Sequence, residues 1–170
     1  MQTQETKRQH AHDFDFWPGR WRGANRKLLK LFVGCDEWER FDATIEVAAF
    51  PGGIGNYDVF LAEQWRPGFV GLSFRVYDPV ADRWSIYWLE NRSGGVDHET
   101  GSLLPPVVGR FVDGVGVFEG REIYEGRPIV VRYRWSNITP ATARWEQSFS
   151  TDEGRTWEIN WVSDMTRLAD

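Results

Sequence analysis

Two glutamates occupy positions where a strand could hold a carboxyl group among aromatic side chains. Glu90 continues an alternating set formed by Trp84, Ile86 and Trp88. Glu63 belongs to a similar set, whose other members are Tyr57, Val59, Leu61 and Trp65. A carboxyl group among aromatic rings has a raised pKa and can act as a general acid or base. The alternative is that each glutamate lies at the solvated end of its strand, because buried glutamates are rare.

The rest of the sequence shows little that is typical of catalysis or metal binding. No Gly-x-Ser-x-Gly motif is present, and the only cysteine, Cys35, excludes an intrachain disulfide. His10 and His12 lie near the N-terminus, and His98 stands alone in a loop. We therefore expect no metal site and no cofactor.

Aromatic residues are frequent, at 15% of the chain, with ten Trp, eleven Phe and five Tyr. The simplest interpretation is that they fill a wide β core. The second is that some of them line a cavity for a small apolar or aromatic ligand. We predict a ligand site in which aromatic rings supply stacking and Glu90 supplies one polar contact: Tyr57, Trp88, Glu90, Tyr133, Trp145 and Trp161.

β-strands would position these residues. Apolar and polar side chains alternate over residues 127–168, which is typical of half-buried antiparallel strands joined by turns. Such runs, separated by turns rich in Gly, Pro and Asp, occur about ten times. They cover residues 20–33, 37–47, 56–65, 69–77, 83–91, 107–112, 115–124, 129–136, 143–150 and 157–166.

Consecutive strands with short turns favour an all-β, antiparallel up-and-down β-barrel, because closure removes exposed strand edges. Residues 13–19 end at a Pro-Gly breaker and predict a short N-terminal helical turn. Residues 1–12 are polar and predict a disordered lead-in, which leaves residues 13–170 as one domain.

Charged side chains alternate with the aromatic ones near the C-terminus, as Arg132, Arg134, Arg144, Glu146 and Glu158. We expect this face in solvent, with cross-strand pairs such as Arg134 and Glu146 contributing up to ~1 kcal/mol each. The alternative places the charges inside and the aromatic residues outside, and would require an oligomer to cover them.

The net charge of −5 argues against nucleic-acid binding, which needs a basic surface. No apolar run approaches the roughly 18 residues of a membrane span. The polar N-terminus lacks the apolar segment of a signal peptide, so we expect a cytoplasmic protein.

Gly19-Arg20-Trp21 stands at the start of the first strand, and Arg167 follows the last. The chain resembles the lipocalins and their calycin relatives, which carry Gly-x-Trp at that place. The resemblance implies that Arg167 packs over Trp21 and closes the bottom of the barrel. The runs from residues 84–88 to 157–161 resemble an uncharacterised bacterial family of lipocalin-like barrels.

A second motif runs from Ser150 to Trp157 and resembles the Asp box of sialidase propellers. One copy cannot make a propeller, so we interpret it as a structural clamp on a hairpin. Asp152 would accept hydrogen bonds from turn amides, Gly154 would take a positive φ, and Trp157 would cover the turn.

Three functional hypotheses follow. The first is a barrel that binds a small apolar or aromatic ligand. The second is an enzyme that uses Glu90 or Glu63 as a general acid or base in the same cavity. The third is an interaction protein that forms a homodimer through exposed aromatic residues.

Overall fold

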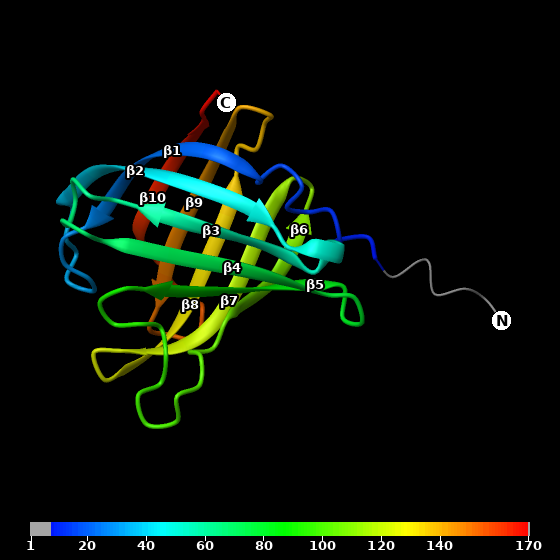
Figure 1. Cartoon of the computed structure of the whole chain (residues 1–170). Helices are drawn as coiled ribbons and strands as arrows, with labels where there is room; N and C mark the ends of the chain where they lie inside the picture. The colour runs from blue at the N-terminus through cyan, green and yellow to red at the C-terminus, as the bar shows by residue number, and fades with distance from the viewer. Residues whose placement is uncertain (1–7, 170) are drawn as a thin grey trace.

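The computed structural model describes residues 8–169, which form one closed antiparallel β-barrel (Figure 1). Consecutive strands are hydrogen-bonded neighbours, and β1 also pairs with β10. The elements are β1 Gly19–Leu28, β2 Trp38–Ala49, the 3₁₀ helix η2 Pro51–Gly53, β3 Gly55–Leu61, β4 Val70–Asp78, β5 Arg83–Glu90, β6 Val107–Val112, β7 Val115–Tyr124, β8 Arg127–Ser136, β9 Thr142–Ser150 and β10 Glu158–Arg167. The predicted all-β up-and-down barrel is confirmed. No helix within residues 8–169 has the length and apolar character needed to cross a membrane.

Two strands are shorter than the sequence pattern predicts. β1 ends at Leu28 rather than near residue 33, because the chain turns through Phe32, whose φ is 62°. β3 ends at Leu61 rather than at residue 65, because the amide of Trp65 donates to the carbonyl oxygen of Ala62 in a turn. Both departures lie at the same end of the barrel, which we call the open end.

The opposite end is closed by residues 8–17, which form turns held by hydrogen bonds between residues three apart. Phe14 is 2% exposed, and its ring meets four others at centroid distances of 5.1–5.7 Å: Trp84, Phe111, Phe118 and Trp135. The indole N–H of Trp84 donates to the carbonyl oxygen of His10. His10 and Ala11 of the expected lead-in therefore contact the barrel, whereas residues 1–7 lie outside the described part.

Trp21 and Arg167 lie beside this plug. Trp21 is fully buried, and its indole N–H donates to the carbonyl oxygen of Trp17 at 2.8 Å. The guanidinium of Arg167 lies 4.2 Å from the Trp21 ring centroid. It donates to three backbone carbonyl oxygens, those of Phe16, Pro18 and Pro140. Gly19 has φ 127°, and a Cβ there would lie 2.5 Å from Arg167, so this position requires glycine.

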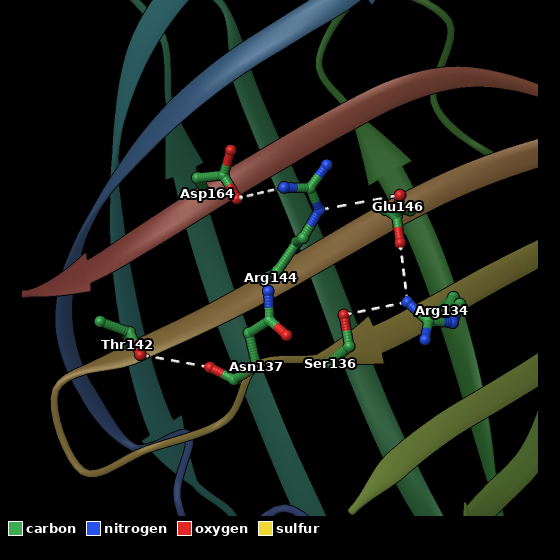
Figure 2. A network of polar contacts seen from close by, with 7 residues as sticks. All are labelled: Arg134, Ser136, Asn137, Thr142, Arg144, Glu146 and Asp164. Atoms are coloured by element: carbon green, nitrogen blue, oxygen red, sulfur yellow. Dashed lines mark hydrogen bonds and ion pairs between the residues drawn. The ribbon is translucent and has the colours of Figure 1, made fainter.

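Strands β8–β10 carry a polar outer face (Figure 2). Arg134 donates to Glu146 on β9 at 2.9 Å. Arg144 lies 3.7 Å from the same carboxylate and donates to Asp164 on β10 at 3.1 Å. The prediction that these charges face solvent and pair across strands is confirmed for Arg132, Arg134, Arg144 and Glu146, and the predicted Arg134–Glu146 pair is present. It is wrong for Glu158, which accepts the Phe32 amide and lies opposite the inward residue Phe149, because the β9–β10 register shifts between Ile159 and Trp161.

The outer face of β3–β5 is apolar instead. The register aligns Tyr57 with Phe74 and Phe74 with Tyr87, and the last two rings stack with centroids 4.7 Å apart. Val59, Leu72 and Leu89 form the adjacent cross-strand row. The expectation that the Tyr57 face points inward is therefore corrected. The interior side of β3 and β4 is formed by Asn56, Asp58, Phe60, Gly71, Ser73, Arg75 and Tyr77.

The β9–β10 hairpin contains the Asp box. One carboxylate oxygen of Asp152 accepts the amides of Arg155 and Thr156, and the other accepts the Thr156 hydroxyl. Bonds from the Thr156 side chain and amide, and then from Ser150, lower the pKa of Asp152 to about 2. Gly154 takes φ 83°, and its carbonyl oxygen accepts the Trp157 indole N–H. The motif links the two strands locally at the open end.

Replacing Arg167 by alanine tests the closure of the barrel. We expect Arg167→Ala to lower the free energy of unfolding by about 2 kcal/mol, because a hydrogen bond from a charged donor contributes ~1.5–3 kcal/mol. Urea denaturation measures the change. Arg155→Ala, at an exposed position in the Asp-box hairpin, is the matched control and should change stability by less than ~0.5 kcal/mol. Equal stabilities of the two variants would contradict this role for Arg167.

Candidate functional site

The interior of the barrel contains a cavity of about 80 Å³. Its wall is mainly aromatic, because the inward positions of five strands and the N-terminal plug supply large rings. These rings belong to Trp17, Phe60, Trp88, Tyr133, Trp135, Trp145 and Trp161. Ile45, Ile86 and Met165 complete the apolar part of the wall. An apolar cavity with a few polar groups is the usual form of a small-molecule site.

Trp161 is the centre of the aromatic wall. Its ring centroid lies 5.7–6.2 Å from those of five others: Phe41, Phe60, Trp65, Trp88 and Trp145. Its indole N–H donates to Asn25 Oδ1 at 3.0 Å, and Asn25 in turn donates to the Gly23 carbonyl oxygen. Polar bonds therefore fix the orientation of a ring that packing alone would leave adjustable.

The position of the Trp88 ring depends on a glycine, Gly71, that has no side chain to block it. Gly71 lies on the neighbouring strand, and a Cβ at that position would come within 2.1 Å of the Trp88 ring. The absence of a side chain there lets the indole lie against β4. The position of this part of the wall is therefore set by β4.

A buried ion pair lies deeper in the barrel. Arg75 Nη1 lies 2.7 Å from Asp58 Oδ2, and the two side chains are 4% and 5% exposed. Arg75 also donates to Asn56 Oδ1 at 3.0 Å, and the Trp17 indole N–H donates to Asp58 at 3.3 Å. The guanidinium lies 5.5 Å from the Trp135 ring centroid. Each buried charge is thus compensated by the other and by hydrogen bonds, which burial requires.

Three donors of the cavity residues have no hydrogen-bond partner within the described chain. They are the Nε of Arg75, the indole Nε1 of Trp135 and the hydroxyl of Ser163. Leaving a buried donor unpaired costs ~1–3 kcal/mol. Burial also raises the pKa of Tyr133, so its phenol is neutral in this wall. The cavity wall therefore includes three side chains whose buried donors lack a partner within the described chain.

A larger vestibule of about 510 Å³ lies at the open end. Its wall includes residues 27–33, the end of β7 at Tyr124 and the inward residues Gln147 and Phe149 of β9. Gln147 lines both spaces and donates to Asn160 Oδ1 at 2.8 Å. Gln147 therefore lies between the vestibule and the inner cavity.

The structure brings together four of the predicted ligand-binding residues: Trp88, Tyr133, Trp145 and Trp161 line the cavity. Tyr57 does not, because it lies on the outer face of β3 with its ring 5.5 Å from that of Phe50.

The two candidate catalytic carboxylates lie away from the cavity. Glu63 is exposed and accepts the Gly68 amide at 2.6 Å. Glu90 accepts bonds from Arg92 and Ser93 at the open end. Burial acts to raise the pKa of Glu90, but these bonds outweigh it and lower the pKa. The raised pKa that the enzyme hypothesis needs is therefore not found at Glu90. A raised pKa is found instead at Glu122, on the inward side of β7, where burial is the cause.

Sequence reasoning missed the polar side of the cavity. Asp58, Ser73 and Arg75 alternate with apolar residues, and the larger apolar set was assigned to the interior. A signal was present, because Asp58 and Arg75 occupy the same parity as Phe60 and Tyr77 on their strands. Asn25 and Ser163 carried no comparable signal.

The comparisons with known proteins establish the fold. No protein-family model matches the chain, and no curated protein matches it by sequence. Among solved structures it is similar to the S-type phycobiliprotein lyase CPES from Guillardia theta, with a TM-score of 0.59 and 13% sequence identity. The match covers 100% of this chain and 99% of that one. The predicted lipocalin-like barrel is therefore confirmed as a fold.

The buried ion pair gives a direct test of the interior. Asp58→Asn keeps the side-chain shape but leaves the Arg75 charge unpaired, so we expect the free energy of unfolding to fall by about 3–5 kcal/mol. The double variant Asp58→Leu/Arg75→Met removes both charges and should recover most of that loss. Urea denaturation of the three proteins measures both effects. A double variant as unstable as the single one would contradict this compensation.

Proposed function

We propose that this protein binds a small aromatic or apolar molecule that carries a hydrogen-bond acceptor. The single observation that supports this most strongly is the cavity itself. Its wall combines ordered aromatic rings with unpaired donors from Arg75, Trp135 and Ser163. A space that only completed a core would gain nothing from these donors, because each costs free energy until an acceptor reaches it.

The two volumes indicate how such a ligand would lie. The inner cavity, at about 80 Å³, is smaller than the ~300–1,000 Å³ typical of sites for drug-sized molecules. The vestibule of about 510 Å³ falls within that range. We infer that an aromatic head with its acceptor enters the inner cavity and that the rest of the ligand remains in the vestibule.

The comparison with a phycobiliprotein lyase supports this proposal only through the fold. It shows that a protein with a similar barrel is named for an activity toward phycobiliproteins. At 13% identity it assigns no residue and no reaction to this chain. The proposal therefore rests on the cavity of this chain.

Methyl 2-naphthoate is a suitable probe, because it has a fused aromatic body and ester acceptors. We expect it to quench tryptophan fluorescence with saturation and to bind up to about tenfold more tightly than naphthalene, since one hydrogen bond contributes ~0.5–1.5 kcal/mol. Ser73→Phe, which fills the cavity, should abolish saturable quenching. Trp38→Leu, on the outer side of β2, should retain it.

Quenching that survives in the Ser73→Phe variant would place the probe elsewhere and contradict the proposal. Circular dichroism of each variant checks that the barrel is intact, so that lost binding is not confused with lost folding.

A second candidate function is homodimer formation through the outer face of β3–β5. Phe74 and Tyr87 stack there on the surface, next to the row formed by Val59, Leu72 and Leu89. The outward positions between them carry no charge that would select an oppositely charged partner. A two-fold dimer uses the same patch on both subunits, which an uncharged, self-complementary sheet face satisfies.

Sedimentation velocity over a range of concentrations tests the dimer. We expect the parent protein to associate and the Phe74→Glu variant to remain monomeric, because a charge in the patch would be desolvated on association. Thr166→Glu, on the polar outer face of β10, is the matched control and should associate like the parent. A parent protein that is monomeric at the highest concentration would contradict the proposal.

A further inference from the structure

Lys27 is a lysine whose side chain lies against the aromatic rings inside the barrel. The chain has three lysines, Lys7, Lys27 and Lys30, whereas its other basic residues are arginines or histidines. Lys27 lies on the inward side of β1, directly opposite Trp161 on β10. Its Nζ is 4.5 Å from the Trp161 ring centroid and 5.4 Å from that of Trp65. The amine therefore lies where the vestibule meets the aromatic wall of the cavity.

No ion pair or hydrogen bond within residues 8–169 engages this amine. Glu39 lies opposite Lys27 in the β1–β2 register, but its two oxygens accept hydrogen bonds from Arg66 at 2.9 and 3.2 Å. The carboxylate of Glu90 is bonded to Arg92 and Ser93. Both nearby carboxylates are thus hydrogen-bonded to other residues, and the contacts of the Lys27 amine are with the rings of Trp161 and Trp65.

The surroundings make the amine easier to deprotonate. Burial lowers the pKa of Lys27, and the Arg66 charge lowers it further. Glu39 and Glu90 act in the opposite direction and are outweighed. The indole faces of Trp161 and Trp65 attract the protonated form and hold the amine beside the aromatic wall. An amine desolvated in an apolar pocket beside another cation is the usual arrangement of a nucleophilic lysine.

We propose that Lys27 is a covalent attachment site, which forms a Schiff base with the aldehyde or ketone of an aromatic ligand held in the cavity. This inference deepens the proposed function and rests on it, because the cavity must first bind the aromatic part. The carbonyl group would lie at the entrance, where Nζ faces the rings of Trp161 and Trp65.

The reaction is balanced without any further reactant. The neutral Nζ attacks the carbonyl carbon, a C–N bond forms, and the carbonyl oxygen becomes a hydroxyl group. Loss of that oxygen as water, with the two hydrogens of the amine, leaves the C=N bond. No oxidant or reductant is consumed, and added water reverses the reaction.

Reductive trapping of the full-length protein tests the proposal. The protein is incubated with 2-naphthaldehyde, reduced with borohydride, and analysed by intact mass and peptide mapping. We expect adducts concentrated on Lys27. Lys27→Arg, which keeps the charge but has no primary amine, should lose the adduct. Lys30→Arg, at an exposed position three residues further on, should keep it.

The pH profile gives an independent readout. Because the pKa of Lys27 is lowered, its labelling should reach half of its maximum at a lower pH than the labelling of a free lysine amide. Labelling spread equally over the lysines and the N-terminus, or with one common pH profile, would overturn the proposal.

2-Naphthalenemethanol separates the two proposals, because it has the same aromatic body but no carbonyl group. Saturable tryptophan quenching by the alcohol, without an adduct from the aldehyde, would overturn the role of Lys27 and leave ligand binding standing. Absence of both quenching and adduct would overturn the two together. Tight binding of 2-naphthoate that is lost in Lys27→Ala, again without an aldehyde adduct, would show that Lys27 acts only as a charge partner and would overturn attachment.

Discussion

The pairing of β1 with both β2 and β10 is the constraint on which the rest of this structure depends. A sheet of ten strands has two edges unless the first and last strands meet. Only after they meet do the inward side chains of opposite strands face one another across an enclosed interior. The seam is held by backbone bonds along β1 and, at its closed end, by Arg167 over Trp21. Asn25 and Trp161 are bonded across the same seam, so the closing strands also position the central ring of the cavity.

Closure also explains how the interior can contain both indoles and an ion pair. Arg75 and Asp58 are almost fully buried, so each charge is compensated by the other. The aromatic rings around them exclude solvent, and Asn56 and Trp17 take up further hydrogen-bonding capacity. The donors left unpaired belong to three residues of the cavity wall, Arg75, Trp135 and Ser163.

The sequence predicts the architecture well because each strand is a period-two pattern bounded by strong turn residues. It predicts the interior well where the large side chains alternate with charges, as in β8–β10, so that Tyr133, Trp145 and Trp161 were found. It fails on β3, because the outer face with Tyr57, Val59 and Leu61 is more apolar than the inner face with Asn56, Asp58 and Phe60. There Asp58 faces inward and pairs with Arg75 on the adjacent strand, 17 residues further along the chain. The roles of Asn25 and Lys27 depend on contacts with Trp161 on β10, and a local sequence pattern on β1 does not reveal such contacts.

A substitution at Gly71 would change the shape of the cavity, because this residue lies against the Trp88 ring. The width of the hollow near Trp88 is controlled from β4, by a residue that contributes nothing to the wall except its lack of bulk. A methyl group at that site would tilt the indole toward the barrel axis and narrow the space without altering the chemistry of the wall. For the proposed ligand, size would thus depend on Gly71, whereas chemistry would depend on other residues such as Arg75, Trp135 and Ser163.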